Sequence, residues 1–159
     1  DAARLDLPSA THQKEMRGID AYKQRFPDST YEWPIEQNGH VDLIENDKRV
    51  QFKMARIQKS QAGLLLSLTT SAGKDMNGKR LVTPYPHDAF DILVVVWEDE
   101  DGTYHFWSIP ATELTARGYL STTQQPGKTG LKVYGPVGPQ PNESARKKAD
   151  VWSQAFYEY

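Results

Sequence analysis

Three polar side chains have the types and the spacing that phosphodiester cleavage can use. Asp42 lies in an otherwise apolar stretch, and Gln51 and Lys53 follow it along the chain. Because side chains alternate along a strand, Gln51 and Lys53 share one face, while Asp42 lies on the face opposite Val41 and Leu43. In a two-stranded hairpin with a short turn, a carboxylate, an amide oxygen and an ammonium group can then meet on one surface.

This set of groups favours metal-assisted hydrolysis of a phosphate ester. Carboxylate and amide oxygens are suitable ligands for Mg²⁺, which polarises a phosphate and lowers the pKa of an attacking water. A nearby Lys53 can orient that water and stabilise the developing negative charge. From the residues alone, an ordinary amphipathic hairpin with a polar face is an equal alternative.

A fourth candidate is Glu15, which lies on the apolar stripe of the first predicted helix. Helical periodicity extends from about residue 9 to residue 26, and Pro27 ends it. Glu15 takes the stripe position one turn before Ile19. A buried carboxylate without a partner is unfavourable, so either the head of this side chain reaches solvent or the helix start, or Glu15 serves a site.

The elements that must position these groups follow from periodicity and turn residues. The chain reads as a helix, three or four strands, a long loop, two strands and a last helix, which predicts an α+β fold with a mixed sheet. The apolar, β-branched stretch from Phe90 to Trp97 predicts a central strand covered on both faces. The predicted elements are strands at 30–35, 41–45, 49–55, 64–70, 90–97 and 104–109, a loop at 71–87, a short helix or turn ending at Gly118, and a helix at about 143–157.

Length and composition place the chain in a broad class. Its 159 residues suit a single domain, 1–159, with a core at about 9–118 and a Pro- and Gly-rich segment at 121–142. The chain has no Cys, which excludes disulfides, thiol nucleophiles and Cys-ligated zinc. No apolar run approaches the length of a membrane span. The first residue is Asp1, as expected of a processed protein or an excised domain, and we expect an intracellular location rather than secretion.

Charge is distributed unevenly along the sequence. The net charge of −2 argues against a uniformly basic nucleic-acid binder. Residues 53–80 nevertheless hold six basic side chains against one acidic, while residues 84–103 hold six acidic side chains and no Lys or Arg. Such segregation permits one basic face on an acidic protein, although ordinary loop charge gives the same pattern.

The four polar residues, in this order and on these elements, resemble the PD-(D/E)XK nuclease superfamily, which has a restriction-endonuclease-like fold. That superfamily carries a helix Glu, then a hairpin with an Asp and a (D/E/Q)-x-K element. The likeness is greatest to the branch of intron-encoded homing endonucleases and Holliday-junction resolvases. Segments that carry the resemblance are Trp33-Pro34, Val41-Asp42-Leu43, Val50-Gln51-Phe52-Lys53-Met54-Ala55-Arg56, 90–96 and 106–110. Gln51 replaces the commoner acidic residue, and the nearest preceding Pro is not adjacent to Asp42.

The resemblance implies a core of about five mixed strands flanked by helices, and a Mg²⁺-dependent DNA endonuclease in which Mn²⁺ can substitute. Asp42, Gln51, Lys53 and Glu15 take the catalytic positions, and Asp42, Gln51 and Glu15 are the implied metal-site residues. The basic side chains expected to contact DNA are Arg56, Lys59, Lys74, Lys79 and Arg80. Cutting both strands needs two sites, which favours a homodimer. The alternative is a catalytically weak or inactive module that binds nucleic acid or a protein partner.

Overall fold

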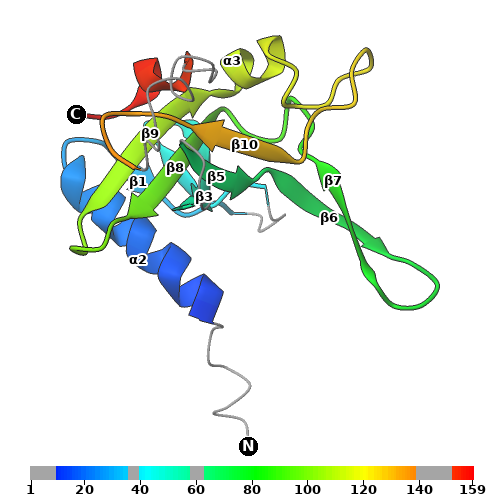
Figure 1. Cartoon of the computed structure of the whole chain (residues 1–159), viewed down its shortest axis with the longest axis horizontal. Coiled ribbons are helices and arrows are strands. Elements are labelled where there is room, and N and C mark those ends of the chain that lie inside the picture. The colour runs from blue at the N-terminus through cyan, green and yellow to red at the C-terminus, as the bar shows by residue number, and fades with distance from the viewer. Residues whose placement is uncertain (1–9, 36–39, 58–62, 139–151) are drawn as a thin grey trace, which may run out of the picture.

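The computed structural model describes residues 10–35, 40–57, 63–138 and 152–159. Its described elements alternate between short strands and a few helices, in an α+β arrangement (Figure 1). They are α2 (Ala10–Arg25), β1 (Tyr31–Glu32), β2 (Leu43–Glu45), β3 (Lys48–Met54), β4 (Arg56–Ile57), β5 (Leu64–Ser67), β6 (Thr69–Lys74), β7 (Arg80–Pro84), β8 (Ile92–Glu98), β9 (Tyr104–Pro110), α3 (Ala111–Ala116), β10 (Gly130–Val133) and the 3-10 helix η1 (Trp152–Phe156). None of the helices in these ranges is long and apolar enough to cross a membrane.

A mixed five-stranded sheet forms the centre of the molecule, in the order β1-β2-β3-β8-β9. Only β3 and β8 pair in parallel, and the other neighbours are antiparallel. The tight β2–β3 turn has Asn46 and Asp47 at φ of 49° and 68°. Asn and Asp tolerate these left-handed angles better than most residues, and two such residues match the twist of a two-residue hairpin. The predicted mixed sheet and the predicted hairpin are therefore confirmed.

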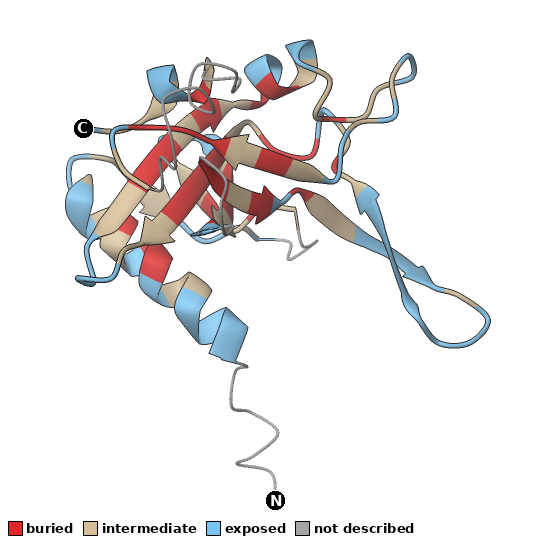
Figure 2. Cartoon of the chain, in the orientation of Figure 1, coloured by how far each residue is buried: buried red, intermediate tan, exposed pale blue. Residues whose placement is uncertain are grey.

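Two separate cores cover the two faces of this sheet. Helix α2 lies across one face, where Ile19 and Tyr22 pack against Val50 and Phe52 of β3. The second core lies on the other face, beneath β5, β10 and α3, and includes Trp107. Strand β8 is buried on both faces, as its composition predicts (Figure 2). The three-stranded sheet β10-β5-β4 forms the outer layer on the side of the second core.

The predicted loop at 71–87 is wrong over most of its length, because β6 and β7 form a two-stranded antiparallel hairpin there. Thr, Ser, Ala and Gly give β6 little apolar periodicity, so pattern alone did not reveal it. The turn is closed by Asp75, whose Oδ1 accepts hydrogen bonds from the amides of Asn77 and Lys79 at 2.8 and 2.9 Å. This Asx-type turn chemistry, followed by Gly78, is the signal that the interpretation as a loop missed.

The end of the chain is only partly described. Most of the helix predicted at 143–157 lies outside the described residues, and Trp152–Phe156 forms a 3-10 helix instead of an α-helix. Its Ser153 Oγ accepts a hydrogen bond from the amide of Tyr134 at 2.9 Å, which attaches η1 to the chain after β10. The Pro- and Gly-rich segment at 121–142 contains the short strand β10.

Helix α2 approaches the sheet closely at Gly18. A Cβ at this position would lie 3.1 Å from Met54 Sδ and 3.3 Å from Val96 Cγ1. We therefore expect Gly18→Val to destabilise the fold by about 1–3 kcal/mol, since overpacking forces the helix away from β3 and β8. Urea unfolding measures this change, with Arg17→Val at an exposed neighbouring position as the control. Equal stability of the two variants would contradict the close packing.

Candidate active site

The Asp42 carboxylate is fixed one residue before β2 begins, opposite the middle of β3. The register pairs Leu43 with Val50, yet the Asp42 amide also donates to Val50 O at 2.8 Å. Two consecutive residues thus face Val50, as in a β-bulge, and a bulge re-aims the side chain of its first residue. Asp42 Oδ2 then accepts a hydrogen bond from the amide of Phe52 at 2.9 Å, in place of a ladder carbonyl.

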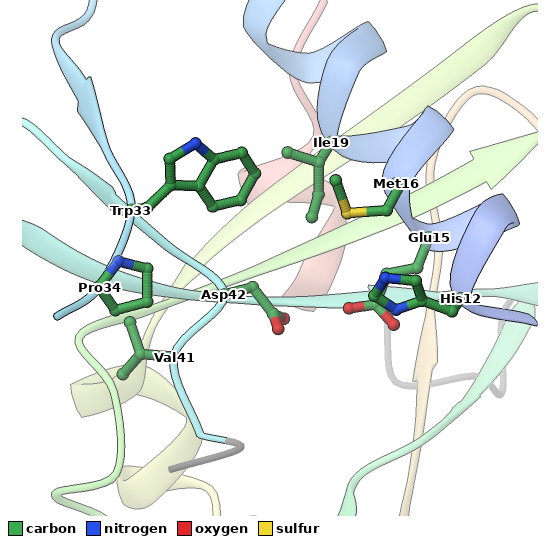
Figure 3. A pocket seen from close by; sticks show the side chains of 8 residues that line it. All are labelled: His12, Glu15, Met16, Ile19, Trp33, Pro34, Val41 and Asp42. Carbon is green, nitrogen blue, oxygen red and sulfur yellow. The ribbon is translucent and has the colours of Figure 1, made fainter. Parts of the chain in front are cut away.

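Glu15 reaches the same place from the helix. It lies on the stripe of α2 that buries Ile19 and Tyr22, and it is itself half-buried. In Figure 3 the Glu15 and Asp42 carboxylates extend toward each other across one cleft. The two groups interact electrostatically and lie within hydrogen-bonding reach of each other. The structure therefore brings together two of the four predicted site residues, from elements far apart in sequence.

The cleft between them has a volume of about 490 Å³. Its walls are mostly apolar, and they come from α2, from the segment after β1 and from the segment before β2. The lining residues are His12, Glu15, Met16, Ile19, Trp33, Pro34, Val41 and Asp42 (Figure 3). Sequence reasoning missed His12 and Trp33. The three-residue spacing from His12 to Glu15, which places both on one face of a helix, could have indicated His12.

Gln51 and Lys53 lie differently from the expectation. Both alternate with Val50 and Phe52, which face α2, so the predicted shared face of Gln51 and Lys53 is confirmed. The direction of the Asp42 side chain does not follow from the same alternation, because the bulge-like offset interrupts the alternation of side chains just before β2. Neither Gln51 nor Lys53 lines the cleft, although the Lys53 charge still acts on both carboxylates around the open edge of β3.

Lys53 is held at the base of the β6–β7 hairpin. Its Nζ donates to Thr69 O over 3.5 Å, a long hydrogen bond, and lies 5.1 Å from the ring centroid of Tyr85. A cation over an aromatic face is attracted by the ring quadrupole. The ammonium group is therefore fixed on the side of the second core, close enough to Glu15 and Asp42 to favour their charged forms.

Gln51 is the one buried polar side chain on β3, with an exposed fraction of 4%. Its Nε2 donates to Phe52 O at 3.2 Å, whereas its Oε1 has no hydrogen-bond partner among the described residues. A buried acceptor without a partner is unfavourable by about 1–3 kcal/mol. Gln51 lies on β3 directly before Phe52, whose amide anchors Asp42.

The donor set fits a hard divalent cation. Glu15 and Asp42 line the cleft and supply carboxylate oxygens, which are ligand atoms that Mg²⁺ prefers, whereas Gln51 lies outside the lining. Within the described ranges no group of three or more His, Cys, Asp or Glu could hold a metal ion. A cation bound in the cleft would therefore have two protein carboxylates, with water or substrate oxygens completing its shell.

Burial has the largest effect on the protonation of the two carboxyl groups. Burial, then the charge of Asp42, raises the pKa of Glu15, while Lys53 and His12 oppose this rise. Burial also raises the pKa of Asp42, against the Phe52 amide and the Lys53 charge, which lower it. The pair therefore retains protons to higher pH than two separate carboxyl groups on a surface would.

The basic residues predicted to contact DNA do not surround the cleft. Lys74, Lys79 and Arg80 lie together at the exposed end of the β6–β7 hairpin, and Arg56 is exposed on β4. Lys59 lies outside the described residues. The acidic run 98–101 falls in the β8–β9 turn, at the opposite side of the molecule from the hairpin tip in Figure 1.

The raised pKa of Glu15 predicts a pH-dependent stability. The folded chain binds this proton more tightly than the unfolded chain, so stability falls as pH rises above the ordinary pKa of 4.5. With a metal chelator in the buffer, Glu15→Gln should raise the unfolding temperature at neutral pH. The difference in unfolding temperature from wild type should vanish below pH 4.5. Circular dichroism melts measure it, with exposed Glu32→Gln as control. A lower unfolding temperature for Glu15→Gln at neutral pH would contradict the repulsive pair.

Comparison with solved structures places the fold among known proteins. A bacterial homing endonuclease, I-Ssp6803I, is similar with a TM-score of 0.65 and 13% identity, over 94% of this chain and 89% of that one. The crystal structure of MepB is similar with a TM-score of 0.57 and 24% identity, over 86% of this chain and 92% of that one. These likenesses support the predicted restriction-endonuclease-like core of the mixed sheet and its helices.

Sequence comparison gives the family. No curated protein matches the chain. The sequence signature of the MepB-like family matches residues 36–158, which include β2, β3 and the whole of the β6–β7 hairpin but not Glu15. Since this match spans most of the chain, the protein belongs to the MepB-like family.

Proposed function

We propose that the protein is a divalent-cation-dependent DNA endonuclease of the PD-(D/E)XK type, with Gln51-x-Lys53 as its last element. The observation that carries this proposal is the pair of carboxylates, Glu15 from a helix and Asp42 from the residue before a strand, which face each other across one cleft and are both influenced by the charge of Lys53. Its second support is the fold, which is similar to that of a homing endonuclease.

Each carboxylate has a distinct physical role in the proposed site. The Phe52 amide fixes the orientation of Asp42, so this anion is in position before any ligand arrives. Glu15 supplies a second oxygen ligand whose raised pKa makes cation binding stronger as pH rises, because the bound form must be ionised. Gln51 Oε1 is the third oxygen. A bound Mg²⁺ would polarise the phosphate and acidify a water molecule.

Lys53 contributes charge without binding the cation. Its ammonium group can donate hydrogen bonds to a phosphate oxygen or to a water near the carboxylates, and it stabilises the negative charge that develops on the phosphate. Its present partner is a carbonyl at 3.5 Å, a weak contact that a phosphate oxygen can replace.

DNA as the substrate is supported by charge and by likeness. The hairpin tip gathers Lys74, Lys79 and Arg80, while the acidic run lies at the opposite side. An acidic protein with one basic projection can attract a polyanion to that projection. The structural relative is itself a homing endonuclease.

A second candidate is a module that binds DNA without cutting it. It is favoured by Gln51, which leaves the site with two carboxylates where the commoner motif has a further acidic group. Incubation with supercoiled, linear and branched DNA in Mg²⁺, Mn²⁺ or EDTA separates the two. Cleavage that requires the cation supports the nuclease, whereas binding in every buffer without cleavage supports the module.

Asp42→Asn should abolish cation-dependent cleavage while the protein stays folded. The amide oxygen of Asn can still accept the Phe52 amide, so the variant removes the charge and keeps the anchor. Plasmid nicking in Mg²⁺ and Mn²⁺ measures the effect, with Asp101→Asn in the exposed β8–β9 turn as control. Full activity of folded Asp42→Asn would remove Asp42 from the site.

Lys53→Ala should lower the single-turnover cleavage rate by about two orders of magnitude or more. Cation affinity, measured by calorimetry, should change little, because Lys is not a ligand. Lys48→Ala, at the exposed start of the same strand, is the matched control. Weakened DNA binding with an unchanged single-turnover rate would show that Lys53 is only a phosphate contact.

A further inference from the structure

The β6–β7 hairpin, residues 69–84, extends away from the rest of the fold as a two-stranded ribbon (Figure 1). It forms a sheet of its own, and in the described part of the chain neither of its outer edges pairs with another strand. Both strands are largely exposed along their length (Figure 2). A ribbon with no core of its own to cover is positioned for contact with something outside the chain.

The surface of this ribbon is thin and partly apolar. Strand β6 presents small side chains from Thr69 to Gly73, so little projects from its backbone. Apolar side chains are exposed nevertheless: Leu81 by 42%, Val82 by 52% and Met76, at the turn, by 103%. Exposed apolar side chains on a projecting element indicate a contact surface more than a solvated loop.

The charges of the ribbon favour a polyanion as its binding partner. Lys74, Lys79 and Arg80 lie at its far end, and the register pairs Lys74 with Arg80 across the strands. Asp75 is the only acidic residue of the ribbon, and one of its carboxylate oxygens is occupied by the amides of Asn77 and Lys79. Three cations on a narrow element match the phosphates on either side of a nucleic-acid groove.

The root of the ribbon adjoins the proposed catalytic lysine. Thr69, the first residue of β6, accepts the hydrogen bond from Lys53, and Tyr85, just after β7, lies under the same ammonium group. Thr70 is also close to His40, with Oγ1 and Nδ1 3.4 Å apart. DNA that is bound along the ribbon would therefore pass the proposed active site at the root of the ribbon.

We infer that the ribbon enters the major groove of double-stranded DNA and holds the duplex beside the site; this inference rests on the proposed function. The major groove is about 12 Å wide and admits a two-stranded ribbon, whereas the minor groove is only about 6 Å wide. Six residues of β6 span about 20 Å. At about 3.4 Å per base pair, the tip contacts DNA about six base pairs from the cleaved phosphate.

Charge neutralisation tests the contact. Lys74→Gln, Lys79→Gln and Arg80→Gln together should flatten the dependence of log affinity on log salt by about two to three units. Binding is measured by fluorescence anisotropy in EDTA, so that no cleavage occurs. The control, Lys48→Gln, Arg117→Gln and Lys128→Gln, removes the same charge elsewhere and should leave the slope unchanged. An unchanged slope for the ribbon variant would overturn the inference.

A tethered probe tests the position. Because the chain has no Cys, Asn77→Cys provides a single thiol at the ribbon turn for an iron chelate that breaks DNA nearby. In an Asp42→Asn background, we expect strand breaks about six base pairs from the wild-type Mg²⁺-dependent cut. Asp101→Cys, in the β8–β9 turn, is the control and should give none. Absence of breaks from position 77, or equal breaks from both positions, would overturn the inference.

A blocked groove identifies the docking mode. Duplexes whose cytosines carry glucosylated hydroxymethyl groups have an obstructed major groove, and they should lose most of the affinity that depends on the ribbon. Unchanged affinity for them would overturn major-groove docking. The measurements of binding do not require cleavage. If the protein cleaves DNA but the ribbon variant keeps its salt slope, only the inferred ribbon contact is refuted. If binding depends on the ribbon but no cleavage occurs, the proposed nuclease activity is refuted and the ribbon contact remains supported.

Discussion

The hydrogen bond from the Phe52 amide to the Asp42 carboxylate is the interaction on which the site depends. It takes the place of a backbone contact one residue before the start of β2, so the strand pair opens without leaving the Phe52 amide unsatisfied. The opening exposes one edge of β3 to groups from both layers. Glu15 approaches from the helix layer, and Lys53 acts from the opposite face of the same sheet.

The helix layer is placed by an equally specific contact. Gly18 lets α2 lie close to Met54 and Val96, and Glu15 is one turn earlier on the same side of the helix. Burial of Ile19 and Tyr22 in the first core then holds the helix at that depth. The carboxylate pair is therefore a product of packing: the two acids are held together although burial raises the pKa of each.

Sequence predicted the parts of this arrangement that local pattern controls. Helix α2, the β2–β3 hairpin and the doubly covered β8 follow from periodicity, from Asn46-Asp47 and from β-branched composition. The order of Glu15, Asp42, Gln51 and Lys53 indicated the site through resemblance. The direction of Asp42 could not be predicted, because a bulge-like offset of one residue reverses the alternation rule. The β6–β7 ribbon was missed because its strands have almost no apolar pattern and depend on a side-chain-bonded turn at Asp75.

The open edges of that ribbon have a consequence for the behaviour of the protein at high concentration. Unpaired strand edges are templates for association between chains, and natural sheets limit this with charged side chains, bulges and proline. The ribbon has all three: Lys74 and Arg80 on paired positions, a register shift between Ser71 and Lys74, and Pro84 at its end. The same cations therefore also oppose pairing of these edges between two chains, whatever else they contact.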